Sequence, residues 1–236
     1  MALDEMRCWA FIFVRGGSKG VPRKNIKPLA GKPLVVHSID IALQMPEIER
    51  VIVSTEDEEI AEVAKAAGAD VPFMRPQELA TDSAPEWLAW RHAVTKAQEK
   101  WGDFDKFVSL PATSPCRSVD DVRRSIIGLN DGVDIVVTAT ASNHHPQFNM
   151  IKIANDGKCS RFIEPSQDIV RRQDASKAYN LATVAYVTRP SFILQSQGMW
   201  DGVMNAVLVD QMNAVDIDSE ADFKMAELIL MDRYAG

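Results

Sequence analysis

The sequence predicts an α/β fold in which helices cover both faces of a mostly parallel sheet. Short apolar runs alternate with longer segments whose apolar residues recur at helical spacing. Most of these runs are followed by enough chain for the helical crossover that joins two parallel strands. With 236 residues, 46% of them hydrophobic, the chain can bury the core of one elaborated domain spanning residues 1–236.

Six short apolar runs are expected to form the strands. Each run is too short for a typical helix and is rich in residues that favour extended backbone. The predicted strands are residues 8–14, 50–55, 71–74, 105–110, 133–140 and 205–210.

Five segments are expected to form helices, and residues at several of their ends support this. Pro33 stands near the first turn of one helix, and Gly68 ends the next, whose first turn is acidic. Ser219 is expected to cap the last helix, with Glu220 and Asp222 in its first turn. The predicted helices are residues 33–45, 57–69, 84–101, 119–129 and 219–234.

The regular alternation breaks between residues 141 and 189. This stretch contains a turn at Asn155-Asp156-Gly157, a long polar segment and the apolar run "LATVAYV", but no segment with helical spacing. It is therefore expected to form strands and long loops, as an insertion or subdomain on the sheet.

Composition and charge exclude several classes of protein. The formal net charge is -7 and the pI is near 5.2, which argues against a nucleic-acid partner. No apolar run approaches the roughly 20 residues needed to cross a membrane, and the start of the chain lacks the basic leader of a signal peptide. Three widely spaced cysteines favour reduced thiols, so a cytoplasmic protein is expected.

A glycine-rich, basic turn follows the first predicted strand. Residues 15–27 contain five cations and no acid. Ligands of open parallel sheets bind beyond the carboxyl ends of the strands, and Arg15 follows a strand directly. Gly16, Gly17 and Gly20 let backbone N–H groups approach a phosphate, although the spacing is not that of a P-loop. The alternative interpretation is a solvated basic loop.

The segment "RGGSKGVPRKNIKPLAGKPL" resembles the signature loop of the acylneuraminate cytidylyltransferases, which make CMP-activated sialic acids and related sugar acids. The resemblance covers nearly the whole chain, with "RPQELATDSA", "TSPCR", "RRQD" and "VDIDSEADFKMAE" in the family's order. It implies a Rossmann-like nucleotidyltransferase sheet with a β-rich dimerisation insertion at residues 141–189. It also implies a cytoplasmic homodimer that uses CTP and Mg²⁺.

The resemblance assigns roles to residues that match the family's motifs. Lys24 would neutralise charge on the α-phosphate, and with Arg15 and Asp218 it makes the catalytic set. Arg75 and the main chain near Ala84 would read cytosine. The nucleotide-binding residues implied are Arg15, Gly17, Ser18, Lys19, Lys24, Asn25, Arg75 and Ala84.

Two acidic residues near the C-terminus form a candidate magnesium site. Asp216 and Asp218 are separated by one residue, so on an extended segment their carboxylates point the same way. Mg²⁺ takes one or two carboxylates together with substrate phosphates and water. The alternative is that Asp218 and Ser219 simply begin the last helix.

The resemblance places the sugar side of the site in the insertion. Arg171 and Arg172 can pair bidentately with a carboxylate, and Gln173 and Tyr179 complete the implied sugar-binding set. A surface basic pair is the alternative. This chain departs from the family here, because Pro111 replaces a sugar-contacting glutamine and Ala182-Thr183 replaces Asn-Gly.

The expected function is a cytidylyltransferase that couples CTP to a nonulosonic acid and releases pyrophosphate. Two alternatives stay open, namely a 3-deoxy-D-manno-octulosonate cytidylyltransferase and a non-catalytic CTP-binding protein. Cys116 beside Arg117 is expected to have a somewhat lowered pKa without acting as a nucleophile.

Overall fold

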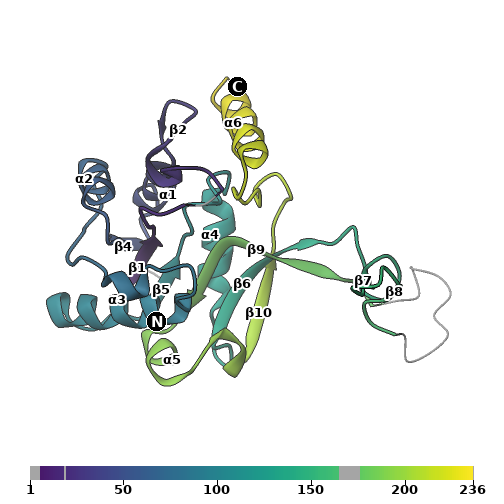
Figure 1. Cartoon of the computed structure of the whole chain (residues 1–236). Coiled ribbons are helices and arrows are strands. Elements are labelled where there is room, and N and C mark those ends of the chain that lie inside the picture. Colours follow the sequence, from purple (N-terminus) through teal and green to yellow (C-terminus); the bar gives the residue numbers. More distant parts are fainter. Residues whose placement is uncertain (1–5, 19, 165–175, 236) are drawn as a thin grey trace.

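The computed structural model describes residues 6–18, 20–164 and 176–235. A six-stranded sheet in the order β10-β6-β9-β5-β1-β4 forms its centre (Figure 1). β1 pairs in parallel with β4 and β5, and β10 pairs in parallel with β6, whereas β9 is antiparallel to β5 and β6. The predicted α/β fold with a mostly parallel sheet is confirmed. The strands of this sheet are β1 (Cys8–Phe13), β4 (Ile48–Ser54), β5 (Lys106–Ser109), β6 (Ile135–Ala141), β9 (Tyr179–Thr188) and β10 (Met204–Leu208).

The remaining elements surround this sheet. Two small hairpins lie outside it, β2 with β3 and β7 with β8. The hairpin strands are β2 (Pro28–Leu29), β3 (Lys32–Pro33), β7 (Ile151–Ile153) and β8 (Cys159–Arg161). The helices are α1 (Leu34–Leu43), α2 (Glu58–Ala66), α3 (Glu86–Trp101), α4 (Val119–Gly128), α5 (Pro190–Gln195) and α6 (Glu220–Ala235), with 3-10 turns η2 (Lys24–Ile26), η3 (Gln77–Leu79) and η5 (Met199–Asp201).

Helices cover the sheet on both faces because side chains alternate along its strands. In β1, Ala10 and Ile12 belong to the core cluster that also contains residues of α1, α2 and α4. Trp9 and Phe11 belong to the opposite cluster, which contains residues of α3 and α5. The two-residue period of a strand thus places one apolar set against each layer of helices.

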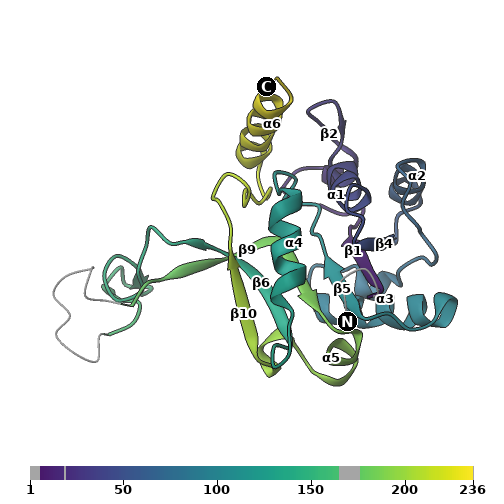
Figure 2. The ribbon, with the colours of Figure 1, turned by 180° about the vertical axis from the view of Figure 1, so that it is seen from behind.

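The predicted insertion, residues 141–189, lies partly in the sheet and partly outside it. Residues 179–188 of this stretch form β9, which pairs with β6 and β5 in the centre of the sheet. Residues 142–164 and 176–178, with the β7–β8 hairpin, belong to an arm that projects from the sheet in both views (Figures 1 and 2). The apolar run "LATVAYV" lies in β9, and the central position of this strand explains the burial of residues 184–187, whereas Leu181 nearer the arm is exposed.

The short strand predicted at residues 71–74 is not present. Asp70 makes a single parallel bridge with Ile52, and the chain then leaves the sheet. Pro72 has no backbone N–H and cannot continue the ladder of hydrogen bonds, which explains the difference.

The predicted cap of the last helix is confirmed. Asp222 N donates to Ser219 Oγ, and Asp222 Oδ2 accepts hydrogen bonds from Ser219 N and Oγ. Among the described residues, no helix has the length and apolarity that crossing a membrane requires.

Candidate functional site

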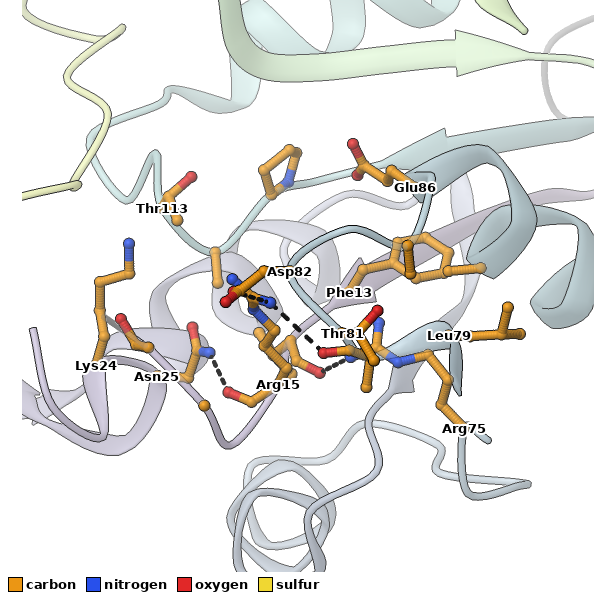
Figure 3. A pocket seen from close by; sticks show the side chains of 18 of the residues that line it. Phe13, Arg15, Lys24, Asn25, Arg75, Leu79, Thr81, Asp82, Glu86 and Thr113 are labelled. Carbon is orange, nitrogen blue, oxygen red and sulfur yellow. Dashed lines mark hydrogen bonds and ion pairs between the residues drawn. The ribbon is translucent and has the colours of Figure 1, made fainter. Parts of the chain in front are cut away.

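A pocket of about 400 Å³ opens beyond the carboxyl ends of β1 and β5, where the sequence predicts a ligand. Figure 3 shows Lys24 and Asn25 at one end, Glu86, Leu79 and Arg75 at the other, and Arg15 between them. Loops after β1, β4 and β5 form most of the lining, and the start of α3, β9 and the segment before α6 add the rest. The lining includes Arg15, Gly17, Ser18, Lys24, Asn25, Arg75, Leu79, Ala80, Thr81, Asp82, Ala84, Glu86, Pro111, Ala112, Thr113, Thr183, Tyr186 and Asp218.

Seven of the eight predicted nucleotide-binding residues meet in this pocket. They come from two segments, the turn after β1 and residues 75–84, which lie far apart in the sequence. The eighth, Lys19, lies outside the described residues. The prediction that these residues share one site therefore agrees with the geometry.

Glu56 joins the two segments. Its Oε1 accepts a hydrogen bond from Gly16 N at 2.7 Å, and its Oε2 accepts one from Arg75 Nη2 at 2.9 Å. Arg75 Nη2 also donates to the Val14 carbonyl at 2.7 Å. The buried Arg75 guanidinium therefore stabilises the turn after β1, through Val14 and Glu56, and also lines the pocket.

The glycines of the turn permit close approach to neighbouring segments. A Cβ atom at Gly20 would lie 1.9 Å from the Asp218 carbonyl oxygen, and one at Gly16 would lie 2.3 Å from Asp57 Oδ2. At these two positions only glycine lets the turn pack against the start of α2 and the segment that carries Asp218.

The cations of the turn divide into two groups. Arg15 and Lys24 line the pocket, where Arg15 Nη1 lies 2.6 Å from Asp82 Oδ1. Arg23 instead pairs with Asp57 and Glu59 at the start of α2, and Lys27 pairs with Glu220 on α6. Half of the described cations in the turn therefore fasten it to neighbouring helices.

Lys24, like Arg75, is a buried cation that lines the pocket. Its side chain is only 10% exposed, its Nζ donates to the Ile217 carbonyl, and Nζ lies 3.6 Å from Asp218 Oδ1. Asn25 Nδ2 donates to the Arg15 carbonyl at 2.8 Å, so this side chain also shapes the turn. Lys24 is thus held between the glycine turn and the acidic C-terminal segment.

The two predicted metal ligands differ in environment. Asp218 lines the pocket, and its side chain is 82% exposed. Asp216 Oδ1 is buried and has no hydrogen-bond partner among the described residues. A buried carboxylate oxygen without a donor suits a cation, and one or two carboxylates beside phosphates and water are a usual ligand set for Mg²⁺. No group of three or more potential ligands occurs in the described part of the chain.

The predicted sugar-binding residues are less well placed. Arg171, Arg172 and Gln173 lie outside the described residues. Tyr179 is half exposed at the start of β9, opposite Ala141, and does not line the pocket. Its role stays a prediction.

The sequence reasoning did not assign roles to several residues that line the pocket. Desolvation by the surrounding protein raises the pKa of Glu86, a residue that is still exposed to solvent and whose carboxylate accepts a hydrogen bond from Trp90 Nε1 at 3.2 Å. Burial, with smaller contributions from the charges of Glu86 and Asp216, raises the pKa of Tyr186 to about 12. An acid in the first turn of a helix has an ordinary structural explanation, and no local signal marks Tyr186.

The expectation for Cys116 is wrong. Burial raises the pKa of its thiol to about 11, and the opposing effects of Arg233 and Arg117 are smaller. All three cysteines are free, as predicted.

Comparisons with known proteins agree with this geometry. The model of the family described as Cytidylyltransferase matches residues 10–147. "Post-translational flagellin modification protein B" of Campylobacter coli is 31% identical over 233 residues, which cover 98% of this chain and 97% of that protein. "CMP-N,N'-diacetyllegionaminic acid synthase" of Campylobacter jejuni is 30% identical over 222 residues, 93% of each chain.

A similar solved structure is that of "CMP:2-keto-3-deoxy-manno-octonic acid synthetase complexed with CTP". Its TM-score is 0.70 at 16% sequence identity, and the match covers 96% of this chain and 99% of that one. At this identity the likeness shows a shared fold, which includes the central sheet that positions the pocket.

Proposed function

The chain belongs to the cytidylyltransferase family, and from this premise we propose that it couples CTP to a nonulosonic acid, giving a CMP-sugar and pyrophosphate. The resemblance to acylneuraminate cytidylyltransferases is thereby confirmed. The main structural support for this reaction is that Arg15, Lys24 and Arg75 line the same pocket, beyond the carboxyl end of β1. A legionaminic-type acid is the first substrate to test, since a relative that matches 93% of this chain is named for making its CMP derivative.

The cationic end of the pocket is assigned to the triphosphate. Arg15 and Ser18 bind phosphate oxygens, and the phosphates replace Asp82 as the partner of the Arg15 guanidinium. Lys24 lies beside the acidic C-terminal segment, where its ammonium group offsets the charge that grows on the α-phosphate during attack. Lys19 is proposed to contribute as its motif implies.

The opposite end is assigned to the base. Arg75, Leu79 and Ala84 line it, and the buried Arg75 guanidinium offers donors that suit the carbonyl oxygen of cytosine. Asn25 holds the turn through its bond to the Arg15 carbonyl and lines the pocket, where it can contact the ribose.

Mg²⁺ is proposed as the metal, and Asp216 and Asp218 are the residues that would hold it. Bound Mg²⁺ would orient phosphate oxygens and offset their charge. The 3.6 Å separation of Lys24 Nζ and Asp218 Oδ1 keeps the ammonium group near this carboxylate, so the chain itself balances part of the charge.

The acidic sugar is assigned to the wall formed by Pro111, Thr113, Thr183 and Tyr186. Its hydroxyl attacks the α-phosphorus and pyrophosphate leaves, and the wall positions the two reactants in one pocket. Tyr179, Arg171, Arg172 and Gln173 are proposed to reach the sugar from the arm, as the family motif implies.

We also propose that the protein is a cytoplasmic homodimer. Large apolar side chains of the arm are exposed in the single chain, among them Ile151, Ile153, Phe162 and Ile163. Such a group favours an interface on the arm. Sedimentation that shows only the 26.2 kDa monomer would contradict this assembly.

The test of the function is pyrophosphate release by the purified protein. CTP, Mg²⁺ and each of several acids are supplied, including N-acetylneuraminate, legionaminic-type and pseudaminic-type acids, and 3-deoxy-D-manno-octulosonate. We expect release with CTP and a nonulosonic acid, and none with ATP, GTP or UTP. Turnover restricted to the eight-carbon acid would favour a 3-deoxy-D-manno-octulosonate cytidylyltransferase. CTP binding without turnover on any acid would favour a non-catalytic CTP-binding protein.

A further inference from the structure

Arg117 lies buried behind the wall of the pocket that contains Pro111 and Thr183. It is 2% exposed, and each of its three nitrogens donates a hydrogen bond. Nε donates to the Val184 carbonyl at 2.8 Å, and Nη1 donates to Ser38 Oγ at 2.5 Å. Nη2 donates to the Pro111 carbonyl. One guanidinium thus joins β9, α1 and the connection that follows β5.

The acceptor on β9 belongs to an irregularity in the sheet. Tyr186 pairs with Val137, whereas Ala182, four residues earlier, pairs with Thr138, so β9 has a bulge of three extra residues, 183–185. Bulges re-aim side chains next to functional sites. Here Thr183 of the bulge and the adjacent Tyr186 line the pocket, and the Val184 carbonyl bonds to Arg117.

Two further contacts hold the bulge from its other sides. Thr138 Oγ1 donates to the Ala182 carbonyl at 2.7 Å and accepts from Ala185 N at 3.3 Å. Ser114 Oγ and Thr183 Oγ1 are 2.6 Å apart. Arg117 joins the bulge to Pro111 itself, because its guanidinium bonds both carbonyls, and the Ser114–Thr183 contact is a second link to the same connection.

A buried cation needs a reason, since removing a guanidinium from water is costly unless its donors are satisfied. Its hydrogen-bond acceptors in the described part of the chain are two carbonyls and a hydroxyl, with no carboxylate among them. Burial lowers the pKa of Arg117 to about 9, while Asp216 is one of the groups that favour its charged form. A planar fork can serve three acceptors from three segments at once, which a lysine cannot do in the same geometry.

We propose that Arg117 is a positioning residue for the acidic sugar, which sets the wall of Pro111 and Thr183 without touching either substrate. This inference rests on the proposed function, because it takes that wall to be the sugar side of the pocket. The phosphate and base ends are built by the turn after β1 and by residues 75–84, with which Arg117 shares no hydrogen bond among the described residues.

The test compares two buried cations. Arg117→Lys and Arg117→Met are the variants, and Lys106→Met is the matched control. Lys106 is also buried and donates to the carbonyls of Ile126 and Leu129, but it does not line the substrate pocket. We expect both Arg117 variants to raise KM for the acid by about tenfold or more, since small misplacements near a reacting group are costly. KM for CTP should stay within about twofold, and Lys106→Met should move neither KM even where it lowers Tm. Unchanged KM values for the Arg117 variants, or an equal rise for both substrates, would overturn the inference.

A further variant and a further measurement test the inference even if the Arg117 variants fold poorly or the wild type shows no turnover. Ser38→Ala removes one acceptor of Arg117 and leaves the arginine in place, so a smaller selective rise in KM for the acid is expected. Hydrogen exchange of residues 182–186 needs no activity. Faster exchange there in Ser38→Ala and Arg117→Lys, and not in Lys106→Met, would support the positioning role. Identical exchange would refute it, while absence of turnover in the wild type would refute only the proposed function.

Discussion

The Arg15 guanidinium forms an ion pair with Asp82, whose Oδ1 lies 2.6 Å from Nη1. Both residues line the pocket, and they come from the turn after β1 and from the segment before α3. The ligand proposed for Arg15 is a triphosphate, which carries the same sign of charge as Asp82. On the proposed assignment, bound CTP would compete with the Asp82 carboxylate for the Arg15 guanidinium.

Asp82→Asn should consequently bind CTP more tightly than the wild type. The substitution removes the ion pair with Arg15 and a negative charge near the phosphates. Because partly exposed ion pairs contribute little energy, the Kd for CTP should fall by about two- to fivefold. Calorimetry with CTP measures it, and the difference should shrink at high salt because the charges are partly exposed. Glu78→Gln, an exposed acid on η3, serves as the control. Weaker binding by Asp82→Asn would contradict the competition.

Lys24→Met should lower kcat far more than it lowers affinity for CTP. Its ammonium group is proposed to act on charge that develops during attack, and loss of one such group costs about 10²- to 10³-fold in kcat. Lys27→Met is the matched control from the same turn. Lys27 pairs with Glu220 and lies over the Phe223 ring on α6, so its loss should affect the packing of that helix and leave kcat unchanged. Equal effects of the two variants would show that Lys24 has no special role.

The sequence located the turn that lines the pocket because the signals for this turn are local. A strand followed by a glycine-rich turn places Arg15 just beyond the carboxyl end of that strand, and this does not depend on contacts with distant segments. The place of Arg75 beside that turn came from the resemblance alone, since its contact with Glu56 joins segments that no local pattern connects.

Long-range pairing explains what the sequence could not predict. Residues 141–189 were predicted to form an insertion or subdomain, yet β9 of this stretch lies between β6 and β5 in the central sheet. Its partner strands are far away in the sequence, so no local pattern predicts this pairing. The charge count in the turn overstated the phosphate site for the same reason, as Arg23 pairs with Asp57 and Glu59. No role was assigned to Arg117 from the sequence, because two of its three hydrogen bonds reach Ser38 and Val184, which lie far away in the chain.

Asp216→Asn and Asp218→Asn should each raise the Mg²⁺ concentration needed for half-maximal activity. Removal of a carboxylate weakens the attraction for a hard cation, and an increase on the order of tenfold or more is expected. Calorimetry of CTP binding with and without Mg²⁺ gives a second measurement, and a chelator should abolish turnover. Asp222→Asn is the control from the same segment, since Asp222 bonds Ser219 at the start of α6. This control should lower stability by about 0.5–2 kcal/mol, as loss of a helix cap does, and leave the Mg²⁺ requirement unchanged. A shifted Mg²⁺ requirement in Asp222→Asn alone would contradict the assignment.

Glu86→Gln should stabilise the protein more at alkaline than at acidic pH. Desolvation by the surrounding protein raises the pKa of Glu86 in the folded state, so its neutral form is favoured there and ionisation opposes folding. The wild type therefore loses stability as the pH rises from the unfolded pKa of a glutamic acid through the raised folded value, and glutamine removes this loss. Thermal unfolding should be measured at about pH 4 and pH 8, which lie below and well above the ordinary glutamic acid pKa of about 4.3. The gain in Tm for Glu86→Gln over the wild type should be larger at the higher pH. Glu62→Gln, on the exposed side of α2, should show no such gain, because Glu62 makes an exposed ion pair with Lys65. A gain in Tm that is equal at both pH values would mean that the carboxyl of Glu86 titrates normally in the folded state.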